Sequence, residues 1–294
     1  MFSFLHNLFK KKPFGLYICD EYVQATLLNG NMKQPKIIAS GQKALPAGIV
    51  QNGTIMKREE LADIIKQLLA ETKPQPIKVK RCILALPASQ TFEHVFFLEK
   101  NLGSPQIQKF LNEELEETLP LSRGEIKYKI KIMPLTKTQI VFVCAMDINS
   151  ANTYLETLKK NCNLDPEIIE PRHLGMARAV QADFTQDEGI IIVDQSETKI
   201  NWVLFWKGKI FDSNAVSIED LPEDIVASII YFEEKSRRKV TEILVAADQE
   251  KADIIIKSLQ SAVKVPITAV PEVAIATGAG LRALDRNGNQ INLV

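Results

Sequence analysis

The sequence predicts an α/β protein that consists of two similar halves with a smaller α+β subdomain inserted between them. Two stretches of the chain share one order of elements, β-β-β-α-β, without residue identity, which indicates a structural duplication. The stretch between them has its own alternating strands and an amphipathic helix. A chain of 294 residues is long enough for this arrangement.

The first half is expected at residues 15–87. Strands are predicted around 15–19, 22–28 and 36–40, followed by a helix near 57–71 and a buried strand at 81–87. Asn29-Gly30 is a turn signal after the second strand. The helix is predicted from a stripe with a spacing of 3.6 residues, formed by Leu61, Ile64, Ile65, Leu68 and Leu69.

The inserted subdomain is expected at 88–170. A strand at "TFEHVFFLEK" precedes a helix that begins at Ser104-Pro105 and reaches about residue 118. The segments "EIKYKIKIM" and "QIVFVCAMD" alternate as a hairpin does, and a helix is predicted from about 150 to 162.

The second half is expected at 171–288. A helix from Arg172 to Gln181 leads into the strand "GIIIVD" and a hairpin that turns at Lys207-Gly208-Lys209. The next helix, near 220–235, has Ser217 and Asp220 in capping-box positions and Pro222 in its first turn. Its predicted buried residues are Ile225, Val226, Ile229 and Ile230. The strand "EILVAA" then completes the repeated order.

The composition is that of a soluble globular protein, with 46% apolar and 24% charged residues. Lys+Arg and Asp+Glu are equal at 36 each, so no net charge attracts the chain to nucleic acid. The four cysteines are widely separated, which predicts buried thiols in a reducing compartment and neither a disulfide framework nor a zinc site. No apolar run is long enough for a membrane span, and the chain is expected to be cytoplasmic.

Several segments along the chain carry a resemblance to a known family. They are "FLHNLFKKKPFGLYI", "ALPAGIVQNGTIMKREELADIIKQLL", "ALPASQTFEHVFFLE", "FLNEELEETLPLSRGEIKYKIKI", "DPEIIEPRHLGMARAV" and "VPEVAIATGAGLRAL". In this order and spacing, they resemble the type IV pilus assembly proteins of the PilM family. The resemblance covers nearly the whole chain. It implies an actin-like fold with ribonuclease H-like β-β-β-α-β-α halves, and an insert of the kind that PilM shares with the cell-division protein FtsA.

In the actin-like superfamily, two strand-corner-strand loops bind the phosphates of ATP, and they need glycine and hydroxyl side chains. At the first corner this chain has Tyr17, Cys19, Asp20 and Glu21 where the family has Asp, Gly, Ser and Ser. Two carboxylates therefore stand where phosphate oxygens would lie. Two like charges about 4 Å apart repel by about 4 kcal/mol at an effective dielectric near 20.

The second corner keeps its aspartate, Asp194, but has Ser196 and its neighbours in place of the following Gly and Ala. Ser217 and Ala247 replace glycines expected further along. The sequence therefore predicts a pseudo-ATPase with no catalytic residues and no cofactor, and ATP with magnesium only if the site is retained against this pattern. The three histidines lack the spacing of metal ligands, so no metal site is predicted. The Gly-x-Gly at 277–281 is interpreted as a close helix contact.

The resemblance also implies partners. The PilM family binds the N-terminal tail of the inner-membrane protein PilN, whose motif is about Ile-Asn-Leu-Leu-Pro, and links the pilus motor to the inner-membrane platform. The tail lies between the first half and the insert, which here implicates the segments 92–98 and 105–118. The residues predicted to contact it are Phe92, Val95, Phe97, Ile107, Phe110 and Leu111. The acidic run 113–117 is either a solvated helix face or a partner surface.

Two terminal segments carry further predictions. In residues 1–14, Phe2, Leu5, Phe9, Lys10, Lys11 and Lys12 suit weak binding to an anionic membrane. A disordered tail or a helix docked on the body are the alternatives. In residues 289–294, Ile291, Asn292 and Leu293 match the PilN-type motif. This tail either occupies the partner groove of its own or a neighbouring molecule, or resembles the motif by chance.

The leading hypothesis is thus a cytoplasmic adaptor, peripheral to the inner membrane, with a degenerate nucleotide site. A divergent but active actin-fold ATPase or kinase is the first alternative, which ATP titration would distinguish. A polymerising membrane tether like FtsA is the second. It fits less well, because "RALDRNGNQINLV" has little apolar face.

Overall fold

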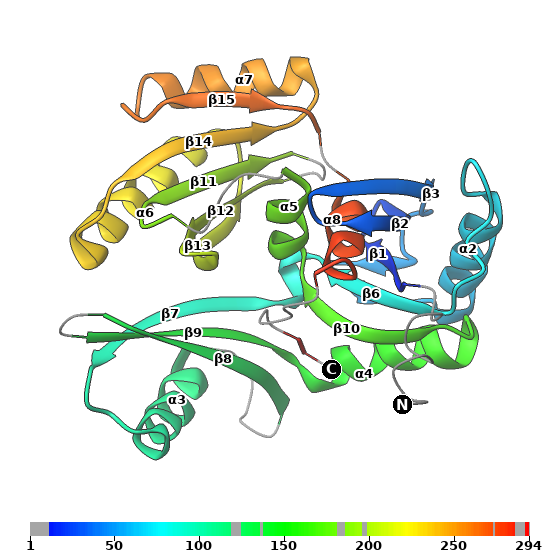
Figure 1. Ribbon diagram of the computed structural model, residues 1–294, viewed down its shortest axis with the longest axis horizontal. Helices are drawn as coiled ribbons and strands as arrows, with labels where there is room; N and C mark the ends of the chain where they lie inside the picture. The colour runs from blue at the N-terminus through cyan, green and yellow to red at the C-terminus, as the bar shows by residue number, and fades with distance from the viewer. Residues whose placement is uncertain are drawn as a thin grey trace.

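The computed structural model describes residues 12–118, 125–135, 138–180, 186–195, 199–272, 274–285 and 292–293. Two five-stranded sheets stand side by side, and a third sheet with its own helix lies below the second of them, at the lower left of Figure 1. Among the helices of these residues, none is long and apolar enough to cross a membrane.

The first sheet has the strand order β10-β6-β1-β2-β3. Its strands are β1 (Phe14–Ile18), β2 (Tyr22–Asn31), β3 (Gln34–Ala44), β6 (Arg81–Leu86) and β10 (Asp165–Pro171). β1 and β2 are antiparallel, as are β2 and β3, whereas β1, β6 and β10 run parallel. A short hairpin of β4 (Val50–Gln51) and β5 (Thr54–Ile55) precedes α2 (Arg58–Glu71). The apolar stripe of α2 faces this sheet, with Leu61, Ile65 and Leu68 buried.

The second sheet repeats this topology in the order β13-β12-β11-β14-β15. Its elements are β11 (Gly189–Asp194), β12 (Ile200–Trp206), β13 (Lys209–Val216), α6 (Leu221–Ser236), β14 (Val240–Ala246), α7 (Gln249–Gln260) and β15 (Ile267–Val270). Each sheet has two antiparallel and two parallel pairings, in the same order across the sheet. The predicted duplication is therefore confirmed, and each copy has one more strand than the β-β-β-α-β pattern included.

The insert contains the three-stranded sheet β7-β9-β8. Its elements are η1 (Ala88–Gln90), β7 (Phe92–Glu99), α3 (Ser104–Thr118), β8 (Ile126–Pro134), β9 (Thr138–Asp147), α4 (Ile148–Glu156) and the π-helical turn η3 (Thr157–Asn161). One face of the sheet packs against α3 through Leu98, Leu111 and Val143. The opposite face packs on the second half, because Val95 and Phe142 belong to the same core cluster as Trp202.

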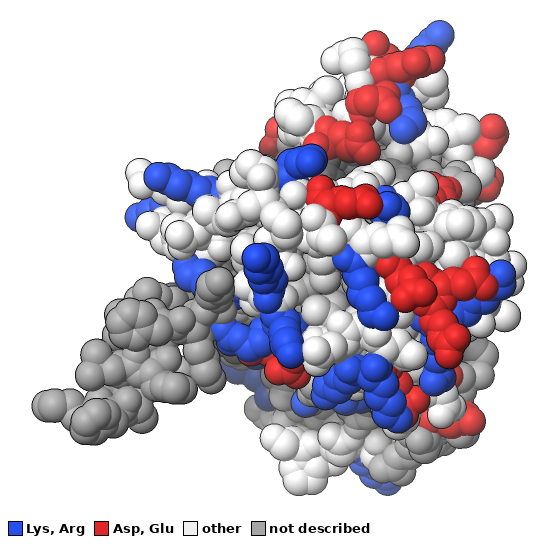
Figure 2. Space-filling view, turned by 90° about the vertical axis from the view of Figure 1, so that its right-hand side faces the viewer, with Lys and Arg blue, Asp and Glu red and all other residues white. Residues whose placement is uncertain are grey.

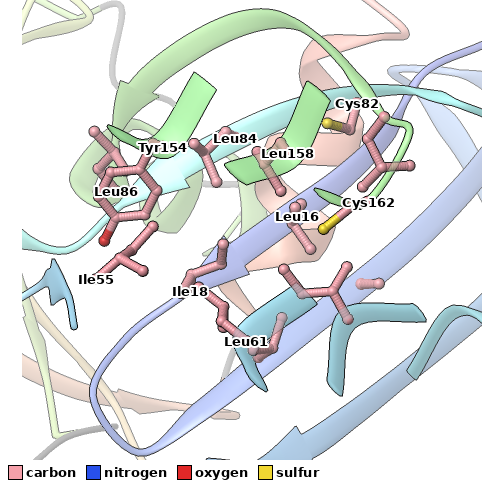
Figure 3. Packing of buried hydrophobic residues seen from close by; sticks show 14 of the residues in the cluster. Leu16, Ile18, Ile55, Leu61, Cys82, Leu84, Leu86, Tyr154, Leu158 and Cys162 are labelled. Atoms are coloured by element: carbon pink, nitrogen blue, oxygen red, sulfur yellow. The ribbon is translucent and has the colours of Figure 1, made fainter. Parts of the chain in front are cut away.

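The predicted boundary at residue 170 is wrong, because β10 pairs with β6 in the first sheet instead of belonging to the insert. The helix α4 and the turn η3 also contribute to the core of the first half, through Tyr154 and Leu158. Figure 3 shows these two residues packed with Leu16, Ile18, Leu84 and Leu86. Local periodicity identifies a strand or helix but does not say which sheet it joins.

Two helices cross between the halves. α5 (Arg172–Val180) and α8 (Ile275–Arg282) come together at Gly175 and Gly278, and α8 lies against β1 in the first sheet. A Cβ atom on Gly278 would lie 1.7 Å from the carbonyl oxygen of Gly175. The interpretation of the Gly-x-Gly as a close helix contact is confirmed. The predicted second half at 171–288 is therefore also drawn too wide, because α8 packs against the first sheet.

The other local predictions have mixed outcomes. The hairpin turn has Lys207 and Gly208 at positive φ, as its sequence indicated. Ile230 is 61% exposed and not buried, because it falls outside the stripe of α6 that Ile225 and Phe232 occupy. All four cysteines are buried and free, as expected, and burial raises the pKa of Cys162 to about 11.

Candidate functional site

The first corner, between β1 and β2, presents Asp20 to the neighbouring β4–β5 hairpin. Its carboxylate accepts hydrogen bonds from the backbone N–H groups of Asn52 at 2.6 Å and Gly53 at 2.7 Å. Both turn residues have positive φ, at 48° and 72°, so their N–H groups converge on one carboxylate. The acid at this corner therefore satisfies donors of its own half. Cys19 is fully buried, and Glu21 is exposed.

The second corner follows β11, and its aspartate is fully buried. The Asp194 carboxylate is paired with the guanidinium of Arg172, which is also fully buried at the start of α5. The ring of Tyr17 from β1 lies under the same guanidinium, 5.6 Å from its centroid. A chain of three side chains, Tyr17, Arg172 and Asp194, thus connects the two corners.

Arg172 was missed by the sequence reasoning, although a signal was present. A cation at the N-terminus of a helix is unfavourable for the helix dipole. Arg172 and His173 both stand there, directly after the buried strand β10. Such residues need an acidic partner from elsewhere in the fold, and Asp194 supplies it to Arg172.

A cavity of about 580 Å³ lies next to this chain of contacts. Its walls include Asp20 and Glu21 from the first half, Glu93 and His94 from the insert, and Asn201 and Asp212 from the second half. Glu93 and the imidazole of His173 are buried 3.5 Å apart, and the hydroxyl of Ser213 donates to Glu93 at 3.3 Å. Burial raises the pKa of Asp212 and lowers that of His94.

Ser217 and Ala247, two further predicted loop positions, do not line this cavity. Ser217 is exposed before α6, where its hydroxyl lies 2.9 Å from the Asp220 carboxylate. Ala247 is buried in the core of the second half, and Ser196 lies outside the described residues. Within the part of the chain that the structure describes, no three His, Cys, Asp or Glu side chains are grouped to hold a metal ion.

The predicted partner residues do not form one surface. Ile107 and Leu111 are buried between α3 and the insert sheet, where Phe110 also packs. Val95 is buried against the second half, and Phe97 contacts Phe211 of β13 at 5.9 Å between ring centroids. Burial contradicts partner contact for Val95, Ile107 and Leu111, because an apolar stripe on a strand or helix marks its core face as readily as a binding face. Partner contact by the partly buried Phe97 and Phe110 stays a prediction.

Phe92 alone of the six lines a described cavity between the first half and the insert. This cavity has a volume of about 610 Å³ and includes Ile55, Met146 and Tyr154 in its walls. The hydroxyl of Tyr154 donates to the carbonyl of Gly53, at the hairpin that also holds Asp20. The border between the first half and the insert is therefore hollowed, with contributions from both units.

The two terminal predictions fall partly on residues that are not described. Phe2, Leu5, Phe9, Lys10, Lys11 and Ile291 lie outside the described residues. Lys12 donates to the carbonyl of Gly30 at 2.6 Å. Asn292 and Leu293 lie against β10 on the chain's own body, where Leu293 is fully buried.

Surface charge is mixed. The face of the molecule that carries α2 shows Lys and Arg interspersed with Asp and Glu, without a large field of one sign (Figure 2). On α3, Glu113 and Glu117 are exposed. An extended basic surface, which binding to nucleic acid phosphates needs, is not present on the face that Figure 2 shows.

Two duplicated sheets around a cleft, with an insert on one side, define an actin-like protein, and comparison with solved structures agrees. The chain is similar to a protein of the "PilM-PilN type IV pilus biogenesis complex", with a TM-score of 0.74 and 15% identity over 94% of this chain and 99% of that one. It is also similar to the cytoplasmic domain of EpsL, an inner-membrane component of the type II secretion system of Vibrio cholerae, with a TM-score of 0.58 and 14% identity over 95% of each chain. EutJ, an ethanolamine utilization protein from Carboxydothermus hydrogenoformans, matches at a TM-score of 0.53 and 10% identity over 92% of this chain and 89% of that one.

The sequence itself identifies the family. The profile of the type IV pilus assembly protein PilM family matches residues 15–173, which is more than half of the chain. The chain therefore belongs to the type IV pilus assembly protein PilM family, and the predicted resemblance and fold class are confirmed. No curated protein sequence matches the chain.

Proposed function

We propose that this chain is a non-catalytic adaptor of type IV pilus assembly, whose actin-like cleft does not hold ATP and magnesium. The observation that carries the proposal is the buried pair of Arg172 and Asp194. In the actin-like superfamily this aspartate organises magnesium or water. Here a guanidinium of the same chain already neutralises it, and both side chains are fully buried.

The first corner supports the same conclusion. Asp20 is held at 2.6 Å and 2.7 Å by the N–H groups of Asn52 and Gly53, so its carboxylate stays at the corner. A triphosphate placed there would meet this fixed negative charge, and Glu21 beside it adds a second. Both corners therefore support the proposal that the cleft does not hold ATP with magnesium.

The proposed partner is the N-terminal tail of a PilN-like inner-membrane protein. Membership of the PilM family and the likeness to a PilM–PilN complex support this partner. The docking region is the border between the first half and the insert, where the cavity beside Phe92 and the outer edge of β10 both lie. In this role the chain works at the cytoplasmic side of the inner membrane and connects the membrane platform to the pilus motor.

Isothermal titration with ATP and magnesium tests the first part. We expect no binding up to millimolar nucleotide in the intact chain. The same titration is carried out on the double variant Arg172→Met and Asp194→Leu as a matched control. This variant lacks the ion pair and leaves no isolated buried charge. Clear micromolar binding by the intact chain would overturn the pseudo-ATPase assignment.

Titration with a peptide that carries the partner motif Ile-Asn-Leu-Leu-Pro tests the second part. We expect saturable binding, which is lost when Asp replaces the first Leu of the peptide. The same affinity for both peptides, or none for either, would contradict the proposed partner.

A further inference from the structure

The outer edge of β10 is covered by two residues of the same chain, Asn292 and Leu293. β10 is an edge strand, because it pairs with β6 on one side only within its sheet. An edge strand presents a row of N–H and C=O groups that another extended chain can pair with. In the described structure, Asn292 and Leu293 lie on this edge.

Three hydrogen bonds fix these two residues. The N–H of Leu293 donates to the carbonyl of Ile169 at 2.8 Å, and the N–H of Ile169 donates to the side-chain oxygen of Asn292 at 3.2 Å. The side-chain amide of Asn292 donates to the carbonyl of Glu167 at 3.4 Å. The asparagine side chain thus acts as a substitute for a strand backbone and extends the sheet by a short step.

The leucine supplies the apolar contact. Leu293 is fully buried and belongs to the core cluster of the first half, together with Met146 of β9 and Leu158 of η3. Full burial of a leucine side chain contributes about 1.5–3 kcal/mol. Backbone hydrogen bonds give such a site affinity, and the pocket under the leucine gives it selectivity. The edge therefore holds, within the chain itself, a segment in which Asn is followed by Leu.

We propose that the outer edge of β10 is the docking strand for the partner's tail, and that residues 292–293 of this chain cover it as a built-in competitor. The inference rests on the proposed function for the identity of the partner. The Asn-Leu pair of a PilN-type motif takes the positions that Asn292 and Leu293 hold, and it must displace them to bind.

The size of the competition follows from the fraction of molecules with an open edge. A tethered segment competes at an effective concentration that reaches the millimolar range for a short linker. If the tail covers the edge in nine molecules of ten, the apparent affinity for the partner peptide falls about tenfold. The tail therefore sets a threshold that the partner's local concentration must exceed.

Fluorescence anisotropy with two labelled probes tests the inference. One probe is the hexapeptide Asn-Gln-Ile-Asn-Leu-Val of residues 289–294, and the other carries Ile-Asn-Leu-Leu-Pro. Both are titrated into the intact chain, into a chain that lacks 289–294, and into Asn292→Ala, which keeps the buried leucine. We expect each probe to bind the shortened chain at least about tenfold more tightly than the intact chain. The Asn292→Ala chain should be intermediate, and each probe should displace the other.

Amide hydrogen exchange supplies a second readout. In the shortened chain, exchange at Ile169 should become faster, and the hexapeptide should slow it again. A hexapeptide with Asp in place of Leu is the matched control and should leave Ile169 unprotected. Protection of the buried amides in β6, read in the same experiment, checks that the shortened chain is folded.

The outcomes separate the two proposals. Equal affinity of the Ile-Asn-Leu-Leu-Pro probe for intact and shortened chains overturns the competition and leaves the proposed partner standing. A second outcome also overturns the competition. If the Phe92→Ala chain loses binding of the probe, and removal of 289–294 does not change its affinity, the partner binds in the neighbouring cavity. Absence of binding by that probe to either chain overturns the proposed function together with the inference, even if the hexapeptide binds.

Discussion

The two corners of the cleft occupy equivalent places in duplicated sheets, yet their acids are held in opposite ways. Asp20 is partly exposed and accepts hydrogen bonds from backbone groups of its own half. Asp194 is fully buried and pairs with Arg172, which begins a helix that follows the first sheet. The first arrangement is local and uses neutral donors. The second joins the halves and places two charges away from water.

This difference teaches what each corner contributes to the fold. A carboxylate on backbone N–H groups orders a loop without any cation. A buried ion pair gains little on balance, because the loss of hydration offsets the attraction, but removing one member leaves an isolated buried charge. The second corner should therefore be sensitive to single substitutions, and the first only moderately so.

Arg172→Ala should have the largest effect. It leaves Asp194 buried without its cation, and it should lower the free energy of unfolding by about 3–5 kcal/mol. Urea denaturation followed by fluorescence of the two tryptophans measures this. Arg58→Ala, in the exposed pair with Glu156, is the matched control and should cost less than about 1 kcal/mol. Similar losses of unfolding free energy in both variants would show that burial of the Arg172–Asp194 pair does not increase the cost of breaking it.

Gly278→Ala tests the helix contact that positions Arg172. The new methyl group would overlap the carbonyl of Gly175 in α5, so the two helices must move apart. We expect a loss of about 2–3 kcal/mol in unfolding free energy, typical of overpacking. Gly280→Ala, whose methyl would lie 3.1 Å from the nearest atom, is the milder comparison. A larger loss in Gly280→Ala would contradict the assigned contact.

Asp20→Ala breaks the first corner. It removes two hydrogen bonds from backbone donors to a charged acceptor, and we expect a loss of about 1–2 kcal/mol, since the site is partly exposed. Amide exchange at Asn52 and Gly53 should become faster. Glu21→Ala, one residue further and exposed, should change neither quantity. If both variants behave alike, the carboxylate of Asp20 does not order the hairpin.

The sequence predicts much of the fold because its signals are local. The stripe of α2 and the turn at Lys207-Gly208 depend on neighbours in the chain, and both appear as expected. The pairing of β10 with β6 joins residues that lie more than eighty positions apart, and no local pattern encodes it. For this reason the boundary of the insert was drawn in the wrong place.

The candidate site was harder to predict for the same reason. The loss of glycine and hydroxyl residues at the corners is visible in the sequence, but the partner of Asp194 is not, because Arg172 stands on another element. The tail shows the opposite case. Asn292 and Leu293 were singled out by their resemblance to a motif, but only the fold places them on β10 and not beside β7 or α3.

Substitution of Asp187 should have the smallest effect on stability, because this acid is exposed whereas Asp194 is buried. Asp187 precedes β11 in the same half, but its side chain is 46% exposed. The Arg238 guanidinium, at 2.9 Å, is the main cause that lowers the pKa of Asp187 from 3.8 to about 2, and Lys207 and the indole N–H of Trp206 add to it. A lowered pKa in the folded state favours folding above the ordinary pKa, and this contribution is lost as the pH falls.

Asp187→Asn should therefore lower the free energy of unfolding at pH 7 by less than about 1 kcal/mol, because solvent screens exposed pairs. The difference from the parent chain should shrink between pH 3.8 and about 2, where the parent's carboxylate becomes protonated in both states. Urea denaturation across this range, at low and high salt, measures it. A loss as large as that of Arg172→Ala, or one that is independent of pH and salt, would contradict the prediction. It would mean that exposure to solvent does not explain why the two acids differ in their contribution to stability.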